Sequence, residues 1–298
     1  MRKTCKIKTK VKFFDKTLWH NYLAVVGVIA MLVTLISFFT TADSINISKP
    51  ILGGGFAILL ALIFLGMWWW ANIANHANLQ INGTRVSVCI GDILGPLSED
   101  PANRAGEINV IGVNDYYDII VDNRIVSSSS LHGQYINRIV AGGKLESLNH
   151  TIETDAILNR CGNSEKVEDR EVGRKTRYNL GSVVEFEAFV LTAFTKFDDH
   201  NKACLSAEEY ASFWMRFWKN IDEIHAGRTI NIPLMGAGIT RFKDGKPSKR
   251  ELLEAMLWSM KLSGFRNTYA DKQVRFIIYP ADAAEIDFYH IQHNPNFK

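Results

Sequence analysis

The chain has 298 residues, a formal net charge of +3 at pH 7 and 47% hydrophobic residues, which are the averages of an ordinary globular protein. No basic stripe accompanies the small positive charge, so the sequence argues against DNA or RNA as a partner. These averages conceal an uneven distribution, because two long uncharged apolar segments lie near the N-terminus.

Those two segments are long enough to cross a bilayer. Residues 22–39 comprise eighteen positions without a charge, and residues 51–70 comprise twenty. At about 1.5 Å of rise per residue, the second segment would span about 30 Å, the hydrocarbon thickness of a bilayer. Residues 40–50 form a short polar linker, so residues 22–70 are expected to be a transmembrane hairpin.

The basic residues predict how this hairpin is oriented. Residues 1–21 contain seven Lys or Arg residues, whereas the linker carries only Lys49. Because basic flanks stay on the cytoplasmic side, the N-terminus is expected there, and two crossings return residues 71–298 to the same side. The sequence therefore predicts a multi-pass protein of the cell membrane with both termini cytoplasmic.

An alternative makes the first apolar segment part of a cleaved signal peptide. The segment exceeds the usual length of roughly 7 to 15 residues and lacks an A-x-A-like cleavage site. Even after such a cleavage, the second span alone would deliver the C-terminal part to the cytoplasm. The expected placement of residues 71–298 therefore does not depend on this choice.

The C-terminal part is long enough for one well-packed domain. Two capping boxes, Ser206 with Glu209 and Ser248 with Glu251, predict the starts of two helices. Asn82-Gly83 is a favoured two-residue hairpin turn and predicts a strand pair at residues 79–81 and 84–90. Short apolar segments with polar or glycine-containing borders predict further strands at residues 108–113, 182–194, 229–234 and 274–279. Strands that alternate with helices predict a three-layer α/β/α domain with a mixed sheet. Residues 160–177 are dense in charges of both signs and are expected to be a solvated loop.

A glycine-containing loop follows the predicted strand 229–234. Gly236 and Gly238 allow backbone N–H groups to approach a ligand closely, and such groups can hold phosphate oxygens. Taken alone, this loop is equally consistent with a simple turn. Asp92 and the pair Asn114 and Asp115 follow two other strands, and ligands collect at the carboxyl ends of strands in open α/β sheets. We therefore expect one crevice suited to a nucleotide.

The order of these motifs resembles that of the macro domains, which are ADP-ribose-binding modules. The motifs are G-D-I at residues 91–93, the strand end at Asn114, and P-L-x-G-x-G at residues 233–238. The resemblance implies that Asp92 accepts a hydrogen bond from the adenine amino group and that Asn114 lies near the distal ribose. The ligand-binding residues expected in this way are Asp92, Ile93, Asn114, Asp115, Leu131, His132, Gly133, Leu234, Met235, Gly236, Ala237, Gly238, Ile239, Thr240 and Arg241.

One departure from the macro-domain pattern concerns the second phosphate loop. The corresponding residues 127–133 read SSSSLHG and retain only Gly133. Catalytic macro domains use this loop and the Asn-containing loop to position water and substrate, so the resemblance favours binding over hydrolysis. We expect no enzymatic activity, metal or cofactor. His132 contacts the ligand or is structural, and Arg241 pairs with phosphate or lies on the surface.

The combination of a membrane hairpin with a macro-like domain resembles the membrane-anchored effectors of type II Thoeris anti-phage defence. In that family a TIR-domain enzyme makes histidine-ADP-ribose from NAD, and the effector binds this signal, disrupts the cell membrane and causes abortive infection. The resemblance implies an ADP-ribose-type signal, the lipid bilayer and, through its product, a TIR enzyme as partners. Two other functions stay open, a membrane-anchored ADP-ribosyl hydrolase and a non-catalytic ADP-ribose-binding scaffold.

Small residues recur every four positions in the second apolar segment. They are Gly53, Ala57 and Ala61, which would share one helix face. Such a face permits close helix contacts in a homo-oligomer that assembles on activation. The alternative is that glycine and alanine are simply common in membrane helices.

Overall fold

The computed structural model describes residues 9–39, 49–97, 106–198, 201–267, 269 and 272–297. The chain forms two compact units. The first comprises Met1–Ala77 together with Ile286–Pro295, and the second comprises Asn78–Glu285 together with Asn296–Lys298. The linker expected at residues 40–50 lies almost wholly outside the described residues, as does the start of the basic N-terminus.

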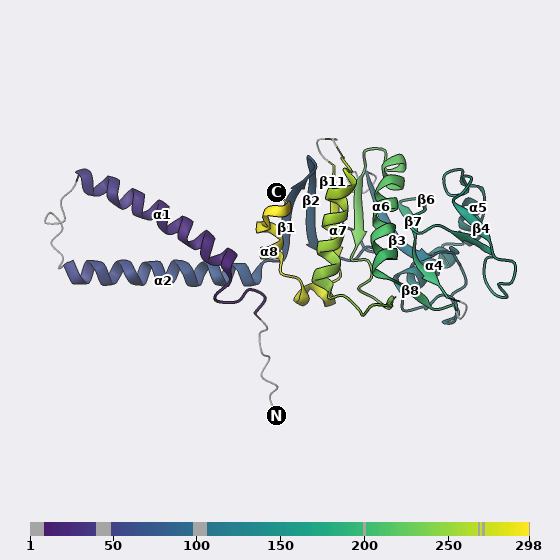
Figure 1. Cartoon of the computed structure of the whole chain (residues 1–298), viewed down its shortest axis with the longest axis horizontal. Coiled ribbons are helices and arrows are strands. Elements are labelled where there is room, and N and C mark those ends of the chain that lie inside the picture. The colour runs from purple at the N-terminus through teal and green to yellow at the C-terminus, as the bar shows by residue number, and fades with distance from the viewer. Residues whose placement is uncertain are drawn as a thin grey trace, which may run out of the picture. The chain divides into compact units, whose positions relative to one another are not determined.

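The first unit contains the two long apolar helices predicted from the sequence, α1 (Lys16–Phe39) and α2 (Lys49–Ile73) (Figure 1). Their most apolar windows have mean hydropathies of 2.5 and 2.3, and 0% and 6% of those windows are buried. A core helix of a soluble domain would bury most of such a surface. The structure thus has two helices of the length and composition that a membrane span requires.

An aromatic cluster joins the N-terminal end of α1 to the C-terminal half of α2, where the Trp19 and Phe64 rings lie 4.7 Å apart. The Val11 carbonyl accepts a hydrogen bond from the Trp68 indole at 3.1 Å, and the Val11 N–H donates to Asn72 at 3.0 Å. Helix α8 (Phe288–His293) joins the same cluster, because Tyr289 is 4% exposed and accepts a hydrogen bond from Asn21 at 2.8 Å. Segments from both termini therefore pack on the base of the hairpin.

The second unit is built on a nine-stranded mixed sheet in the order β1-β2-β11-β9-β3-β7-β8-β10, with β6 paired to β7. The central strands β2, β11, β9, β3 and β7 run parallel, whereas β6 and β8 are antiparallel to β7. The strand bounds are β1 His76–Ile81, β2 Thr84–Ile90, β3 Glu107–Asn114, β6 Val183–Phe186, β7 Phe189–Phe197, β8 Ala203–Leu205, β9 Thr229–Pro233, β10 Arg241–Phe242 and β11 Gln273–Ile278. Strands β4 (Ser164–Lys166) and β5 (Thr176–Tyr178) form a separate small sheet.

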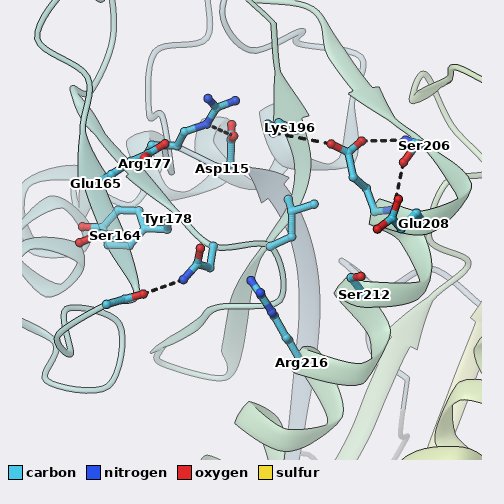
Figure 2. A pocket seen from close by; sticks show the side chains of 14 residues that line it. Asp115, Ser164, Glu165, Arg177, Tyr178, Lys196, Ser206, Glu208, Ser212 and Arg216 are labelled. Atoms are coloured by element: carbon cyan, nitrogen blue, oxygen red, sulfur yellow. Dashed lines mark hydrogen bonds and ion pairs between the residues drawn. The ribbon is translucent and has the colours of Figure 1, made fainter.

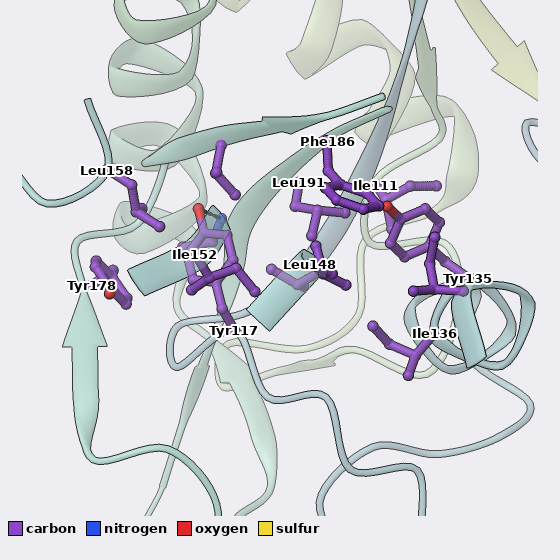
Figure 3. Packing of buried hydrophobic residues seen from close by; sticks show 14 of the residues in the cluster. Ile111, Tyr117, Tyr135, Ile136, Leu148, Ile152, Leu158, Tyr178, Phe186 and Leu191 are labelled. Atoms are coloured by element: carbon purple, nitrogen blue, oxygen red, sulfur yellow. Dashed lines mark hydrogen bonds between the residues drawn. The ribbon is translucent and has the colours of Figure 1, made fainter. Parts of the chain in front are cut away.

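Helices cover both faces of the large sheet, which confirms the three-layer prediction. Helices α4 (Leu131–Ala141) and α5 (Leu145–Thr154) contribute to one buried cluster, which Figure 3 shows around Ile111 and Leu191. On the other face lie α6 (Ala207–Ile224) and α7 (Lys249–Ser263). There the α6 ring of Phe213 lies 4.9 Å from that of Phe194 on β7.

Local sequence signals account for several element boundaries. Asn82 and Gly83 have φ values of 52° and 81°, as a two-residue hairpin turn of type I′ requires. Both predicted capping boxes are present, with Ser206 and Ser248 as the N-caps of α6 and α7. Gly264 ends α7 in the left-handed conformation, with a φ of 72°.

The structure corrects two expectations. Residues 182–194 are not one strand but the hairpin β6–β7, because Glu187 adopts a φ of 56° and reverses the chain. Residues 160–177 are not merely a solvated loop. They contain β4 and the start of β5, and the Arg170 side chain within them is 6% exposed and bonded to a buried carboxylate.

The buried face of α6 predicts a large effect of truncation. Replacing Phe217, which is 0% exposed, with alanine should lower the free energy of unfolding by about 3–5 kcal/mol, because a cavity remains in the core. Replacing Met215 on the exposed face of the same helix should change it by less than about 0.5 kcal/mol. Urea unfolding of the detergent-solubilised chain, followed by tryptophan fluorescence, measures both. Equal losses would contradict the assigned face.

Candidate functional site: a cleft at the carboxyl ends of the parallel strands

Two adjoining hollows lie at the carboxyl ends of β2, β3, β9 and β11. One has a volume of about 280 Å³ and the other about 560 Å³. They share five lining residues, so they form one continuous cleft; these residues are Ser129, Leu131, Pro233, Leu234 and Gly238. The strand-end motifs therefore converge, as the topology of an open α/β sheet predicts. Volumes of this size are typical of small-molecule sites.

The smaller hollow contains the first predicted motif. Asp92 is exposed, and its Oδ1 accepts the Leu94 N–H at 3.0 Å, which fixes the carboxylate at the mouth of the hollow. Ile93 is 5% exposed and packs into the core cluster beneath. Tyr279 and Asp282, which follow β11, line the same hollow. The hollow thus offers a hydrogen-bond acceptor beside an apolar floor and an exposed tyrosine ring.

The glycine-containing loop forms one long wall of the cleft. Gly236 has a φ of 88°, a conformation that other residues rarely adopt. Lys246 Nζ lies 3.2 Å from the Ala237 carbonyl oxygen and 2.7 Å from that of Gly238. Because C=O and N–H point in opposite directions across a trans peptide, the N–H groups of Gly238 and Ile239 point away from Lys246. This loop therefore presents backbone donors that an anion can use.

The facing wall is the beginning of a helix, where we expected a loop. Ser130 caps α4 by accepting the Gly133 N–H at 3.0 Å, so Leu131, His132 and Gly133 form the first helical turn. A Cβ atom on Gly133 would lie 2.1 Å from the Ser127 carbonyl oxygen, which explains why the serine-rich segment retains this glycine. The first N–H groups of a helix have no intrahelical acceptor and favour anions. The serine-rich segment and the helix end thus replace a glycine-rich loop.

The larger hollow continues the cleft beyond these two walls. Asn114 at the end of β3 is 2% exposed, and its Oδ1 accepts the N–H groups of Tyr116 and Asp118 at 3.1 Å each. Its Nδ2 donates to Asp118 Oδ2 at 3.0 Å. An amide nitrogen has two hydrogens, so one more donor remains at the cleft wall. Arg124 and Arg241 contribute cationic side chains to this hollow.

His132 reaches the larger hollow from the first turn of α4 and is 8% exposed. Burial lowers the pKa of His132 from its ordinary 6.5 to about 4, although the Asp118 carboxylate and backbone oppose the shift. The imidazole is therefore neutral at pH 7. A neutral imidazole has one donor and one acceptor nitrogen, so it suits a polar uncharged group better than a phosphate.

Asp115 does not lie in this cleft. Its side chain is 2% exposed and points to a separate hollow of about 530 Å³, where its Oδ2 pairs with Arg177 Nε at 2.6 Å (Figure 2). Burial raises the pKa of the Asp115 carboxyl, and the hydrogen bond and charge of Arg177 oppose that rise. Asp115 lies in the turn after β3, where Arg177 and the Phe197 N–H, which donates to Oδ1 at 3.0 Å, hold its carboxylate in the separate hollow.

Thirteen of the fifteen residues expected to bind the ligand line the cleft, whereas Asp115 and Gly133 do not. Sequence reasoning missed other lining residues. They include Tyr279, Asp282, Asn123, Phe197 and Asn201. The strand-end rule applied to β11 would have found Tyr279 and Asp282. Asn123 and Asn201 lie in loops with φ values of 63° and 55°, and no spacing signal indicates them.

Comparisons with known proteins give one family. A family model described as the macro domain of the Thoeris protein ThsA matches residues 86–279. The Thoeris protein ThsA of Bacillus amyloliquefaciens (strain Y2) is 33% identical over 292 residues, which cover 96% of this chain and 92% of the relative.

Solved structures of an Oceanobacillus iheyensis macrodomain also match. A mutant of it with ADPR has a TM-score of 0.38 and 12% identity, covering 73% of this chain and 96% of that chain. The macrodomain with ADP has a TM-score of 0.36 and 12% identity, covering 73% of this chain and 94% of that chain.

The buried His132 predicts a pH dependence of stability. Between pH 6.5 and 4 the unfolded chain takes up a proton that the folded chain refuses, so the free energy of unfolding should fall as the pH falls. The contribution is on the order of 3 kcal/mol across this window. A His132→Gln variant should lose that part of the slope when urea unfolding is compared at both pH values. His150→Gln on the exposed face of α5 is the control, and identical slopes in all three proteins would contradict the assignment.

Proposed function

The chain belongs to the Thoeris ThsA family, and we propose that it is an anti-phage defence effector whose macro domain binds an ADP-ribose-derived signal. The observation that carries this proposal is the continuous cleft between the glycine-containing loop and the beginning of α4. The cleft comprises two connected hollows. Backbone N–H groups line both walls where the hollows meet, at Leu131 on one side and Gly238 on the other. A nucleotide with a central diphosphate matches that distribution of donors.

The adenine base is proposed to occupy the smaller hollow. There the exposed Asp92 carboxylate accepts a hydrogen bond from the exocyclic amino group, and Ile93 supports the ring from below. A carboxylate of this kind rejects a base that presents a carbonyl oxygen at the same position, because two acceptors would face each other. Tyr279, which is 57% exposed at the rim, is available to stack on the base.

The diphosphate is proposed to lie between the two walls. The N–H groups of Gly238 and Ile239 approach it from one side, and those of Leu131 and His132 at the beginning of α4 from the other. The serine hydroxyls of the capping segment add donors, since Ser129 lines both hollows. This arrangement uses helix and loop N–H groups for charge stabilisation in place of a pair of glycine-rich loops.

The distal ribose and the group attached to it are proposed to fill the larger hollow. Asn114 offers its remaining amide hydrogen there, and the neutral His132 offers a second polar contact. The hollow is about 560 Å³, so a ribose leaves space for a further substituent. We propose histidine-ADP-ribose, made by a TIR-domain enzyme, as this ligand. The protein binds this signal without turning it over.

We propose that the ligand-bound protein acts on the cell membrane. Helices α1 and α2 would span the cell membrane with both termini in the cytoplasm, as the basic N-terminal segment favours. Almost no chain would then lie outside, so a signal can reach the hairpin only from within. Ligand-driven homo-oligomers would bring several hairpins together, disrupt the bilayer and cause abortive infection.

Calorimetric titration of the full chain in lipid nanodiscs tests the ligand. Wild-type protein should bind ADP-ribose and histidine-ADP-ribose, and Asp92→Ala should weaken both by roughly 10- to 100-fold, the effect of losing one charged hydrogen bond. Glu146→Ala, an exposed acidic residue on α5, is the matched control and should bind like wild type. Absence of heat with either nucleotide for the wild-type protein would refute the proposed ligand class. Mass spectrometry of the ligand after incubation should recover it intact.

Dye release from vesicles tests the output. Vesicles that contain the reconstituted protein and a trapped fluorophore should stay sealed without ligand. They should release the dye when histidine-ADP-ribose is added. Asp92→Ala should shift the response to concentrations roughly 10- to 100-fold higher, in step with its weaker binding. Tight binding in calorimetry combined with vesicles that stay sealed would reject membrane disruption and leave the binding function standing.

A further inference from the structure

The charged segment of residues 160–177 reaches two buried carboxylates of the macro domain, Asp115 through Arg177 and Asp118 through Arg170. Arg170 is 8% exposed, and its guanidinium donates to both oxygens of Asp118, at 3.1 Å from Nη1 and 2.7 Å from Nη2. Asp118 is 0% exposed and follows Asn114 by four residues. A buried carboxylate requires partners for its oxygens, and this one has them from two directions.

The first direction is the segment itself, through Arg170 and Arg174. The Arg174 N–H donates to Asp118 Oδ1 at 2.8 Å. Gly173 makes this approach possible, because its φ is 90° and a Cβ atom there would lie 2.5 Å from Asp118 Oδ1. Arg170 Nη1 in turn donates to the Arg174 carbonyl at 2.6 Å. The turn is therefore shaped around the carboxylate.

The other direction leads to the cleft. Asp118 Oδ2 accepts the Asn114 amide at 3.0 Å, and the Asn114 oxygen is already held by two backbone N–H groups. The amide plane is thus fixed, and its second hydrogen has one available direction. Arg170 Nη2 also donates to Asn201 Oδ1 at 3.0 Å, and Asn201 lines the same hollow. Both contacts end at the larger hollow and neither reaches the smaller one.

We propose that Arg170 is a positioning residue for the ribose end of the ligand. Its guanidinium orients the Asn114 amide through Asp118 and orients the Asn201 amide directly, and both amides line the larger hollow. The proposal rests on the proposed function, since it names which part of an ADP-ribose-type ligand depends on this segment. The guanidinium lies 3.7 Å above the Tyr116 ring, which keeps it in the plane that both oxygens require. A lysine has no such planar fork and cannot replace it fully.

The test compares two probes that differ only beyond the diphosphate. Calorimetry of the full chain in nanodiscs should show that Arg170→Met weakens ADP-ribose by roughly tenfold or more and ADP by less than about twofold. Arg170→Lys should fall between Arg170→Met and wild type. Gly173→Ala, which leaves every charge in place, should give the same selective loss as Arg170→Met.

Arg160→Met is the matched control. It removes another guanidinium of the same segment, which pairs with Glu223 at 2.6 Å, and neither residue lines the cleft, so it should leave the ratio of ADP-ribose to ADP affinity unchanged. If Arg170→Met shows no cooperative unfolding transition in a melting experiment, the affinity ratios of Gly173→Ala and Arg170→Lys test the proposal instead. An unchanged ratio in these variants, or an equal loss of both nucleotides, would overturn the positioning role while wild-type binding still supports the function. Wild-type protein that binds neither probe would instead overturn the function itself.

Discussion

Parallel pairing of four central strands is the constraint on which the site depends. Strand β11 pairs in parallel with β2 and with β9, and β9 with β3, so their carboxyl ends all reach the same edge of the sheet. Each end then contributes one feature, Asp92, Tyr279, the glycine-containing loop and Asn114. Because the sheet is buried on both faces, a shift of any of these ends would disturb core packing.

Two buried carboxylates near the end of β3 belong to different hollows. Asp115 lines the separate hollow, and Asp118 bonds to Asn114 at the cleft. Asp115 and Asp118 each pair with an arginine of the same charged segment, and both guanidinium groups approach the ring of Tyr116, at 5.4 Å and 3.7 Å. Burying a charge is costly unless every oxygen is bonded, and here most of the bonds come from a segment that would otherwise be solvated. The segment is consequently part of the domain. Its two arginines, Arg170 and Arg177, pair with the two carboxylates that follow β3.

Much of the fold and site could be predicted because local signals agreed with the final structure. Capping boxes marked α6 and α7, Asn82-Gly83 marked a hairpin, and strand ends gathered thirteen of the expected residues in one cleft. The failures have physical causes. Glu187 reverses the chain without a glycine, and Arg170 is buried by a partner 52 residues away. Asp115 faces elsewhere because it lies in the turn after β3 and its carboxylate pairs with Arg177, 62 residues later.

The end of the chain has a consequence for dissecting this protein. Helix α8 belongs with the hairpin, where Tyr289 meets Asn21, yet Phe297, only a few residues later, is 1% exposed and its ring lies 5.6 Å from that of Trp258 on α7. A fragment that begins after α2 carries α8 without its partners, whereas one that stops at Glu285 removes Phe297 from the core. No pair of cuts isolates the second unit with both surfaces intact, so the two units are best purified together.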